Sequence, residues 1–194
     1  MNITLKRISA YIIDYLFIIL MITLVSQIKF INPKYDKYIE TLNEYNVLYE
    51  EILDNNISII NSSEFTTTYY NLEKYGLSTS ISTIVIYLLY FVGFQKWNNY
   101  QTLGKKVFNI KIVSEKKISW LKMLLRSIIA YNLIFQILSI LALFILNENN
   151  YLIGDILITI VGNIFLYLNL FMIIFNKKHL GIHDIICKTE IKEV

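Results

Sequence analysis

Residues 8–28, ISAYIIDYLFIILMITLVSQI, form an apolar run of 21 residues in which Asp14 is the single charged residue. A helix of this length spans about 30 Å, which matches the hydrocarbon core of a bilayer. The run is long for the apolar part of a signal peptide, and no small-residue cleavage site follows it. The sequence therefore predicts a transmembrane helix that is retained in the protein.

Three further apolar stretches have similar lengths, at residues 77–94, 127–146 and 152–175. The chain of 194 residues is 55% hydrophobic and 17% charged, with a mean hydropathy of +0.49. Soluble domains carry more charge, about a quarter of their residues. We predict an all-α membrane protein in which residues 1–194 form a single domain, a four-helix transmembrane bundle in a lipid bilayer.

Lysine and arginine are distributed unevenly among the segments that join the spans. Residues 95–126 carry eight basic residues and one acid, whereas residues 29–76 carry four basic residues and eight acids. Because basic residues accumulate on the cytoplasmic side, this asymmetry predicts a cell-membrane protein with both termini in the cytoplasm. A basic segment between two spans is expected to contact anionic lipid headgroups, and we predict no nucleic-acid binding.

The longer connections are predicted to be structured. Asn32–Pro33 matches a helix start, and apolar residues recur every three or four positions after it, which predicts an amphipathic helix of about five turns. A turn and a short helix that stops at Gly76 are expected next. Alternation over residues 108–113 predicts a strand, with residues 118–120 as a candidate partner strand, although Ser119 also matches a helix cap. We therefore expect an outer helical cap (29–76), a small cytoplasmic β-containing segment (95–126) and a cytoplasmic tail (176–194).

Asp14 is the polar residue of the first span that most needs a physical explanation. A carboxylate inside a span costs about 2.5–3.5 kcal/mol near the bilayer centre and less toward the rim. Asp14 follows Arg7 by seven residues, two helical turns, so the two side chains share one face. Two interpretations are open: a structural ion pair with Arg7 or Arg126, and a protonatable or cation-binding group on a transport path.

The other spans carry polar residues at helical spacing. Such residues form hydrogen bonds between transmembrane helices, worth about 0.6 kcal/mol each, or they line a polar cavity with Asp14 at one end. The candidates for such a lining are Tyr87, Asn132, Gln136, Asp155 and Asn163.

Two motifs resemble known kinds of site but are incomplete. His179, His183 and Cys187 have the spacing of metal ligands, but Gly181 interrupts the helical turn and no second cluster supplies further ligands. Residues 102–105, TLGK, lack the earlier glycine of a phosphate-binding loop. We therefore expect no metal site, no cofactor and no enzymatic activity.

Four segments, taken in order, resemble the RDD family of small bacterial membrane proteins, which is named for an arginine and two aspartates. They are Arg7-x6-Asp14, residues 101–113 with the TLGK sequence, Arg126, and residues 180–189, LGIHDIICKT, which contain Asp184 as the second aspartate. The acidic 29–76 segment has no counterpart in the shared core of the family. For this family, transport is the usual suggestion, with cation–proton antiport proposed for some members.

The resemblance implies that charged residues from distant segments meet at the cytoplasmic face, where they form either a gate or a latch. The expected members are Arg7, Asp14, Thr102, Gly104, Lys105, Arg126, His183 and Asp184. Our first functional hypothesis is a transporter of a small solute or a cation/proton exchanger, with Asp14 as the coupling acid. The second is a non-catalytic partner or assembly factor that acts through residues 29–78 on a membrane protein or a second copy of the chain.

Overall fold

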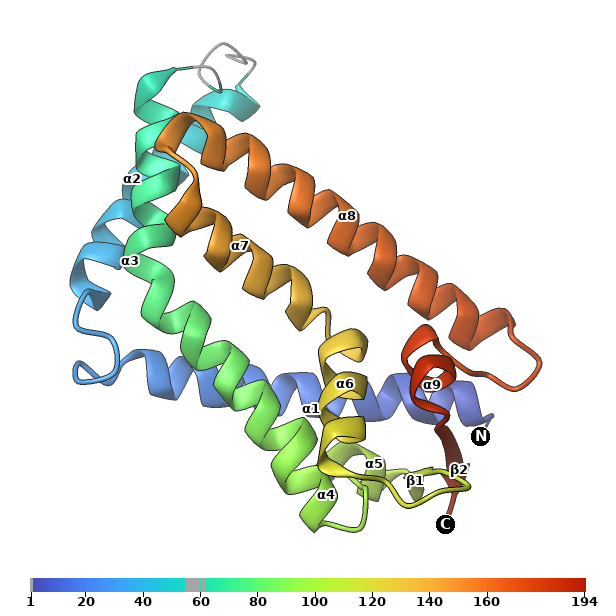
Figure 1. Ribbon diagram of the computed structural model, residues 1–194. Coiled ribbons are helices and arrows are strands. Elements are labelled where there is room, and N and C mark those ends of the chain that lie inside the picture. The colour runs from blue at the N-terminus through green and yellow to red at the C-terminus, as the bar shows by residue number, and fades with distance from the viewer. Residues whose placement is uncertain (1, 55–59, 61) are drawn as a thin grey trace. The chain divides into compact units, whose positions relative to one another are not determined.

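The computed structural model describes residues 2–54, 60 and 62–194, and these fold into two compact units. Unit 1 comprises Met1–Ile22, Thr83–Ile134 and Gly162–Val194, and unit 2 comprises Thr23–Ser82 and Phe135–Val161. Among the described residues, three helices are long and apolar enough to cross a membrane (Figure 1): α1 (Ile3–Ser26), the continuous helix Ser63–Trp97, and α8 (Glu148–Phe175). The prediction of an all-α membrane protein is confirmed.

The third expected span, residues 127–146, is broken and does not form one continuous helix. Helix α6 (Trp120–Ala130) ends before Tyr131, and helix α7 (Leu133–Ile145) begins after Asn132. The backbone of Asn132 has a φ of 60°, a left-handed conformation that asparagine tolerates better than most residues. The Asn132 side chain donates a hydrogen bond to the carbonyl of Gly162 at 2.9 Å, which fixes the break within unit 1. Counted as one broken span, the pair gives a fourth crossing.

Unit 2 contains the expected cap helix, α2 (Tyr35–Leu53), but two predictions around it are wrong. Asn32 does not cap α2; its amide instead donates to the hydroxyl of Thr79 at 2.9 Å. Gly76 does not end a short helix, because α3 (Ser63–Leu88) continues through it. A Cβ atom at Gly76 would lie 3.0 Å from the ring of Tyr38, so the glycine serves the close packing of α2 on α3.

Unit 1 contains a two-stranded antiparallel ribbon that the sequence only half predicts. Strand β1 (Ile110–Val113) lies within the expected segment, but its partner is β2 (Glu190–Glu193), with Ile112 opposite Ile191. Residues 118–120 do not form a strand. Ser119 caps α6 by accepting a hydrogen bond from the backbone N–H of Lys122 at 3.2 Å, so the alternative prediction of a helix cap is confirmed.

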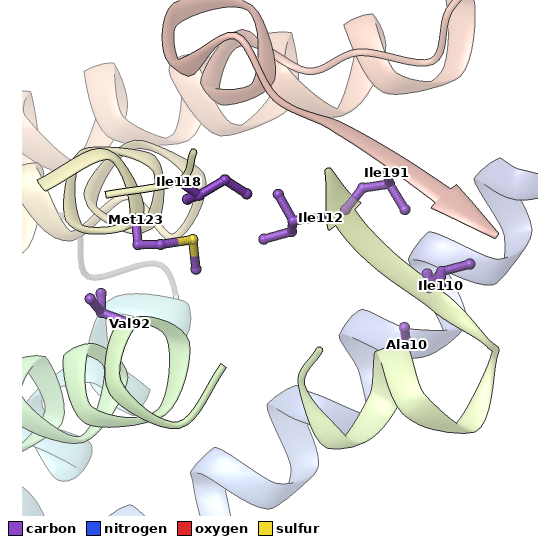
Figure 2. Packing of buried hydrophobic residues seen from close by; sticks show 7 residues of the cluster. All are labelled: Ala10, Val92, Ile110, Ile112, Ile118, Met123 and Ile191. Atoms are coloured by element: carbon purple, nitrogen blue, oxygen red, sulfur yellow. The ribbon is translucent and has the colours of Figure 1, made fainter. Parts of the chain in front are cut away.

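The ribbon packs its apolar face against helices of the same unit (Figure 2). The cluster consists of Ala10, Val92, Ile110, Ile112, Ile118, Met123 and Ile191, all buried. Burying one such aliphatic side chain contributes roughly 1.5–3 kcal/mol. The cluster therefore holds β1 and the C-terminal strand β2 against α1 and α6. The short helices α5 (Leu103–Val107) and α9 (Ile182–Cys187) come directly before these two strands in the chain. These elements position the polar residues described next.

Candidate functional site

Asp14 lies on the buried face of α1 and accepts hydrogen bonds from three neutral donors. Its Oδ1 accepts from the Tyr90 hydroxyl at 2.7 Å and from the backbone N–H of Gly104 at 2.8 Å. Its Oδ2 accepts from the Thr102 hydroxyl at 2.5 Å. Among the described residues, no basic side chain lies within 4 Å of this carboxylate, so the first of the two interpretations of Asp14, an ion pair with Arg7 or Arg126, is wrong.

The N-terminus of α5 is built to meet this carboxylate. Thr102 is the N-cap residue, and its hydroxyl accepts from the backbone N–H of Lys105 at 3.3 Å while donating to Asp14. Gly104 brings the α5 backbone directly against α1, because a Cβ atom there would lie only 2.1 Å from the carbonyl oxygen of Ala10. A glycine is the residue that permits this close approach. The contact therefore locks the segment after the second span onto the first.

Asp184, on α9, forms a second and separate charge cluster. Arg7 donates to its Oδ2 at 2.7 Å, and Arg126 donates to its Oδ1 at 2.9 Å. The hydroxyl of Thr189 also contacts Oδ1 at 3.3 Å. Burial would raise the pKa of Asp184, but the nearby positive charge of Arg126, the hydrogen bond from His183 and the charge of Arg7 hold it well below its usual range. The carboxylate is therefore ionised and ties α1 and α6 to the tail.

The segment that leads into α9 is held by side chains from α1 and α8. Arg7 donates to the backbone carbonyl of His179, and the Thr4 hydroxyl lies 3.0 Å from Nδ1 of the same histidine. Asn169 of α8 accepts from the backbone N–H of Ile182 at 2.9 Å. Its Oδ1 also lies 3.0 Å from Nδ1 of His183. Burial, together with the charge of Arg126, lowers the pKa of His183 to about 4, so its ring is neutral at pH 7.

Lys105, unlike Arg7 and Arg126, does not form an ion pair with a carboxylate among the described residues. Its side chain is buried, and no carboxylate in the described part of the chain lies within 4 Å of its Nζ. With the Gln95 amide oriented so that both of its ends are satisfied, Gln95 donates to the Phe91 carbonyl at 3.0 Å and accepts from Nζ of Lys105 at 2.7 Å. Burial, and then the charge of Arg126, lowers the pKa of Lys105 to about 7.

A cavity of about 370 Å³ lies within unit 1 and adjoins both charge clusters. Ligand pockets in proteins usually have volumes of about 300–1,000 Å³. Its polar wall is formed by Arg7, Asp14, Lys105, Arg126, Asn169 and His183. Nine aliphatic residues and the rings of Tyr11 and Tyr131 form the rest of the lining. The lining therefore combines a polar group of residues, three of them basic with Lys105 and Arg126 buried, with a larger apolar group.

All eight residues of the expected charge network lie in unit 1, but they form two clusters. Asp14, Thr102 and Gly104 make the first, and Arg7, Arg126, His183 and Asp184 make the second, while Lys105 lies beside the cavity. Sequence reasoning missed Gln95 and Asn169. Each is a polar residue within or at the end of an apolar helix, a signal that generally marks an interaction between helices.

The residues of the expected polar lining are divided between the two units. Asp155 lies in unit 2, where it accepts from the hydroxyl of Tyr69 at 2.5 Å and from the hydroxyl of Ser139. Gln136 and Asn163 are exposed. The remaining two candidates, Tyr87 and Asn132, lie in unit 1: Tyr87 packs against Phe91 and Tyr131, and Asn132 bonds to Gly162. None of these five residues lines the unit 1 cavity, whose wall includes Asp14.

The fold and the site define a multi-span helical membrane protein whose first helix, central connection and C-terminal tail are joined by buried charges. The chain belongs to the RDD family: the model of that family matches residues 4–188. The match spans both charge clusters and the acidic segment between the first two spans. No curated protein and no solved structure shows a significant match to the chain.

Proposed function

We propose that this RDD-family protein transports a small solute across the membrane and binds it in the cavity of unit 1. The observation that carries the proposal is the buried, uncompensated Lys105 at the wall of that cavity. Intramembrane and membrane-adjacent ionisable groups that face a cavity typically mark substrate or ion pathways. A ligand group that neutralises Lys105 would satisfy a charge that the protein leaves unmatched.

The arrangement favours an anionic solute over cation–proton exchange at Asp14. The Asp14 carboxylate already accepts three hydrogen bonds, and the Asp184 carboxylate is already paired with two arginines. A carboxylate has about four acceptor positions, and Asp14 has one left. A cation that takes two or more oxygen contacts at Asp14 would therefore displace a donor and leave it buried and unpaired. An anion beside Lys105 displaces none of them.

The proposal includes the orientation of the chain in a cell membrane. With both termini in the cytoplasm, the site lies toward the cytoplasmic side, and the basic segment 95–126 faces anionic headgroups. The exposed rings of Trp97 and Trp120 suit the headgroup region, and Lys96 lies 4.2 Å from the centre of the Trp120 ring. Accessibility of an introduced cysteine at Lys117, which belongs to this segment, to a membrane-impermeant thiol reagent in intact cells tests this orientation.

Flux into proteoliposomes tests the transport proposal. We expect uptake of small organic monoanions that rises with an imposed pH gradient, is lost in Lys105→Met and is retained in the matched surface variant Lys106→Met. Cation flux that disappears in a folded Asp14→Asn protein would contradict the assignment and restore Asp14 as the coupling acid. Absence of flux for anions and cations alike would reject transport.

A second function is favoured by the apolar side chains that α2 exposes. Val47, Tyr49 and Leu53 are each about half exposed on this helix of unit 2. Such exposure on a cap helix suits an assembly factor that binds another membrane protein or a second copy of the chain. If this second function holds, the wild-type protein gives a defined complex in native electrophoresis of membrane extracts, and Val47→Glu abolishes that complex. Neither protein then gives flux above that of empty liposomes.

A further inference from the structure

The residues that line the unit 1 cavity differ in chemistry and in exposure. The polar ones, here called its polar end, include Lys105, Arg126 and His183, each less than 10% exposed. The exposed ones are apolar or aromatic, here called its apolar end, and include Tyr11 of α1 and Ile174 of α8, which are 45% and 47% exposed. Both helices are long and apolar enough to cross a membrane, so lipid is the expected surrounding of these exposed side chains. A cavity lined by both groups of residues suits a ligand that has a charged part and an apolar part.

The charge balance of the polar end fits one monoanion. The basic groups are Arg7, Lys105 and Arg126, and the carboxylates in contact with this region are Asp14 and Asp184. With Lys105 protonated, one positive charge is left without a partner. One bound negative charge restores neutrality, whereas a dianion or a cation does not.

Hydrogen-bonding capacity for that anion remains on Lys105. An ammonium group has three N–H donors, and Gln95 accepts one of them. The guanidinium groups, in contrast, already direct donors to Asp184, to the His179 carbonyl and to Thr189. Lys105 is therefore the primary contact for an anionic group, with the two arginines behind it.

We propose that the cavity binds an acidic amphiphile, with its carboxylate or phosphate monoanion at Lys105 and its hydrocarbon tail leaving between α1 and α8 toward the lipid. This assignment of the ligand rests on the transport function proposed above, because it places the transported solute in the same cavity. A small polar anion would leave the apolar lining without a partner, and a neutral lipid would leave Lys105 uncompensated. The amphiphile alone uses both ends.

Binding of such an anion depends on the protonation of Lys105. The charged groups around Nζ are Arg126 of α6, Arg7 and Asp14 of α1, and Asp184 of α9, and both aspartates are already hydrogen-bonded. A bound anion stabilises the ammonium form, so binding takes up a proton. Affinity is expected to fall by up to about tenfold per pH unit above the pKa of Lys105 in the empty site.

Displacement of a fluorescent fatty acid from the full-length protein in phosphatidylcholine nanodiscs tests the proposal. Dodecanoate and lysophosphatidic acid are the two sources of the acidic head, and the more potent competitor identifies the source. Dodecanol, dodecyltrimethylammonium, acetate and inorganic phosphate each lack one required feature, and we expect them to compete at least about tenfold less well. Equal competition by dodecanol or by acetate overturns the proposal.

Two pairs of variants separate the head and tail contacts. Lys105→Met should weaken dodecanoate binding by at least about tenfold, while Lys106→Met, its exposed neighbour, should not change it. Leu170→Trp fills the tail end without altering any charge and should also abolish binding, whereas Leu168→Trp, exposed on α8 outside the lining, should not. Unchanged binding in both Lys105→Met and Leu170→Trp overturns the proposal. If the protein transports acetate but dodecanoate does not displace the fluorescent fatty acid, the amphiphile proposal is rejected and the transport proposal stands. If dodecanoate displaces the probe but no flux is measured, the transport proposal is rejected and the binding proposal stands.

Discussion

Asp14 is predicted to be a structural group, and its two simplest substitutions should differ in severity. Asp14→Ala leaves the Tyr90 hydroxyl, the Thr102 hydroxyl and the Gly104 N–H without their acceptor. An unpaired buried donor costs about 1–3 kcal/mol, and the two hydroxyls can turn to other acceptors, so the total is on the order of 3–6 kcal/mol. For a chain of this length that lowers Tm by on the order of 15 °C.

Asp14→Asn should be much milder because the amide keeps one oxygen. That oxygen retains the bonds from Tyr90 and Gly104, and the new NH₂ group can donate to the Thr102 hydroxyl, which is also an acceptor. The loss is about 1–2 kcal/mol, the difference between charge-assisted and neutral hydrogen bonds, and Tm falls by on the order of 5 °C.

The Tm of these variants can be measured through the protein's own cysteine. Cys187 is its single cysteine, and it is buried, so a thiol-reactive fluorophore reports unfolding in detergent as the temperature rises. Asp36→Asn is the control, since Asp36 is exposed and pairs with the equally exposed Lys29, an interaction worth less than about 1 kcal/mol. Equal destabilisation by Asp14→Asn and Asp14→Ala would refute the hydrogen-bond argument. An Asp14→Asn protein with wild-type Tm and no flux would refute the structural role.

Three further predictions follow from neighbouring contacts. Gly104→Ala should lower Tm sharply because its Cβ would overlap the backbone of α1. The control Gly93→Ala, with no atom within 4 Å of the new Cβ, should leave Tm unchanged or slightly raised. Similar losses of Tm in both variants would contradict the close contact at Gly104. The pKa of Lys105 is lowered from 10.5 to about 7 in the folded protein. Between pH 7 and pH 10.5 the side chain is therefore protonated in the unfolded chain and neutral in the folded one. Stability should therefore rise by up to about 5 kcal/mol as pH rises from 7 to 10.5, and Lys105→Met should remove this slope in melting curves taken across that range. Arg126→Met and Asp184→Leu should each lower the free energy of unfolding by about 3–5 kcal/mol, and the double variant should lower it by clearly less than the sum of the two. Additive losses in this double-mutant cycle would show that the pair is not coupled.

Local patterns in the sequence were sufficient for three of the four expected spans, the cap helix and the first strand. Helix α2 follows from the spacing of its apolar residues, and β1 from alternation over residues 108–113. The cap of α6 follows from Ser119. The failures lie where a local signal had a second use: Asn32 bonds to a distant threonine instead of capping, and Gly76 accommodates a tyrosine ring instead of ending a helix.

The partners of the charged residues could not be derived in the same way. The shared helix face of Arg7 and Asp14 suggested that they pair, yet each bonds to residues more than 70 positions away in the chain. Which donor reaches which carboxylate depends on how α5 and α9 pack on α1, and that packing is not encoded by helical periodicity. The same holds for β1, whose partner strand is the C-terminal tail.

The sequence by itself determined that this is a helical membrane protein, because hydrophobicity and span length are local properties summed along the chain. The position of Asp14 within an apolar span also marked it as a residue to explain, and the other residues of the charge network were identified through the resemblance to the RDD family. Only the tertiary structure decided that Asp14 is satisfied by neutral donors, that Asp184 is held between two arginines, and that Lys105 is left uncompensated beside a cavity. The physical reason is that the electrostatic state of a buried group depends on atoms within a few ångströms of it, and these come from segments far apart in the chain.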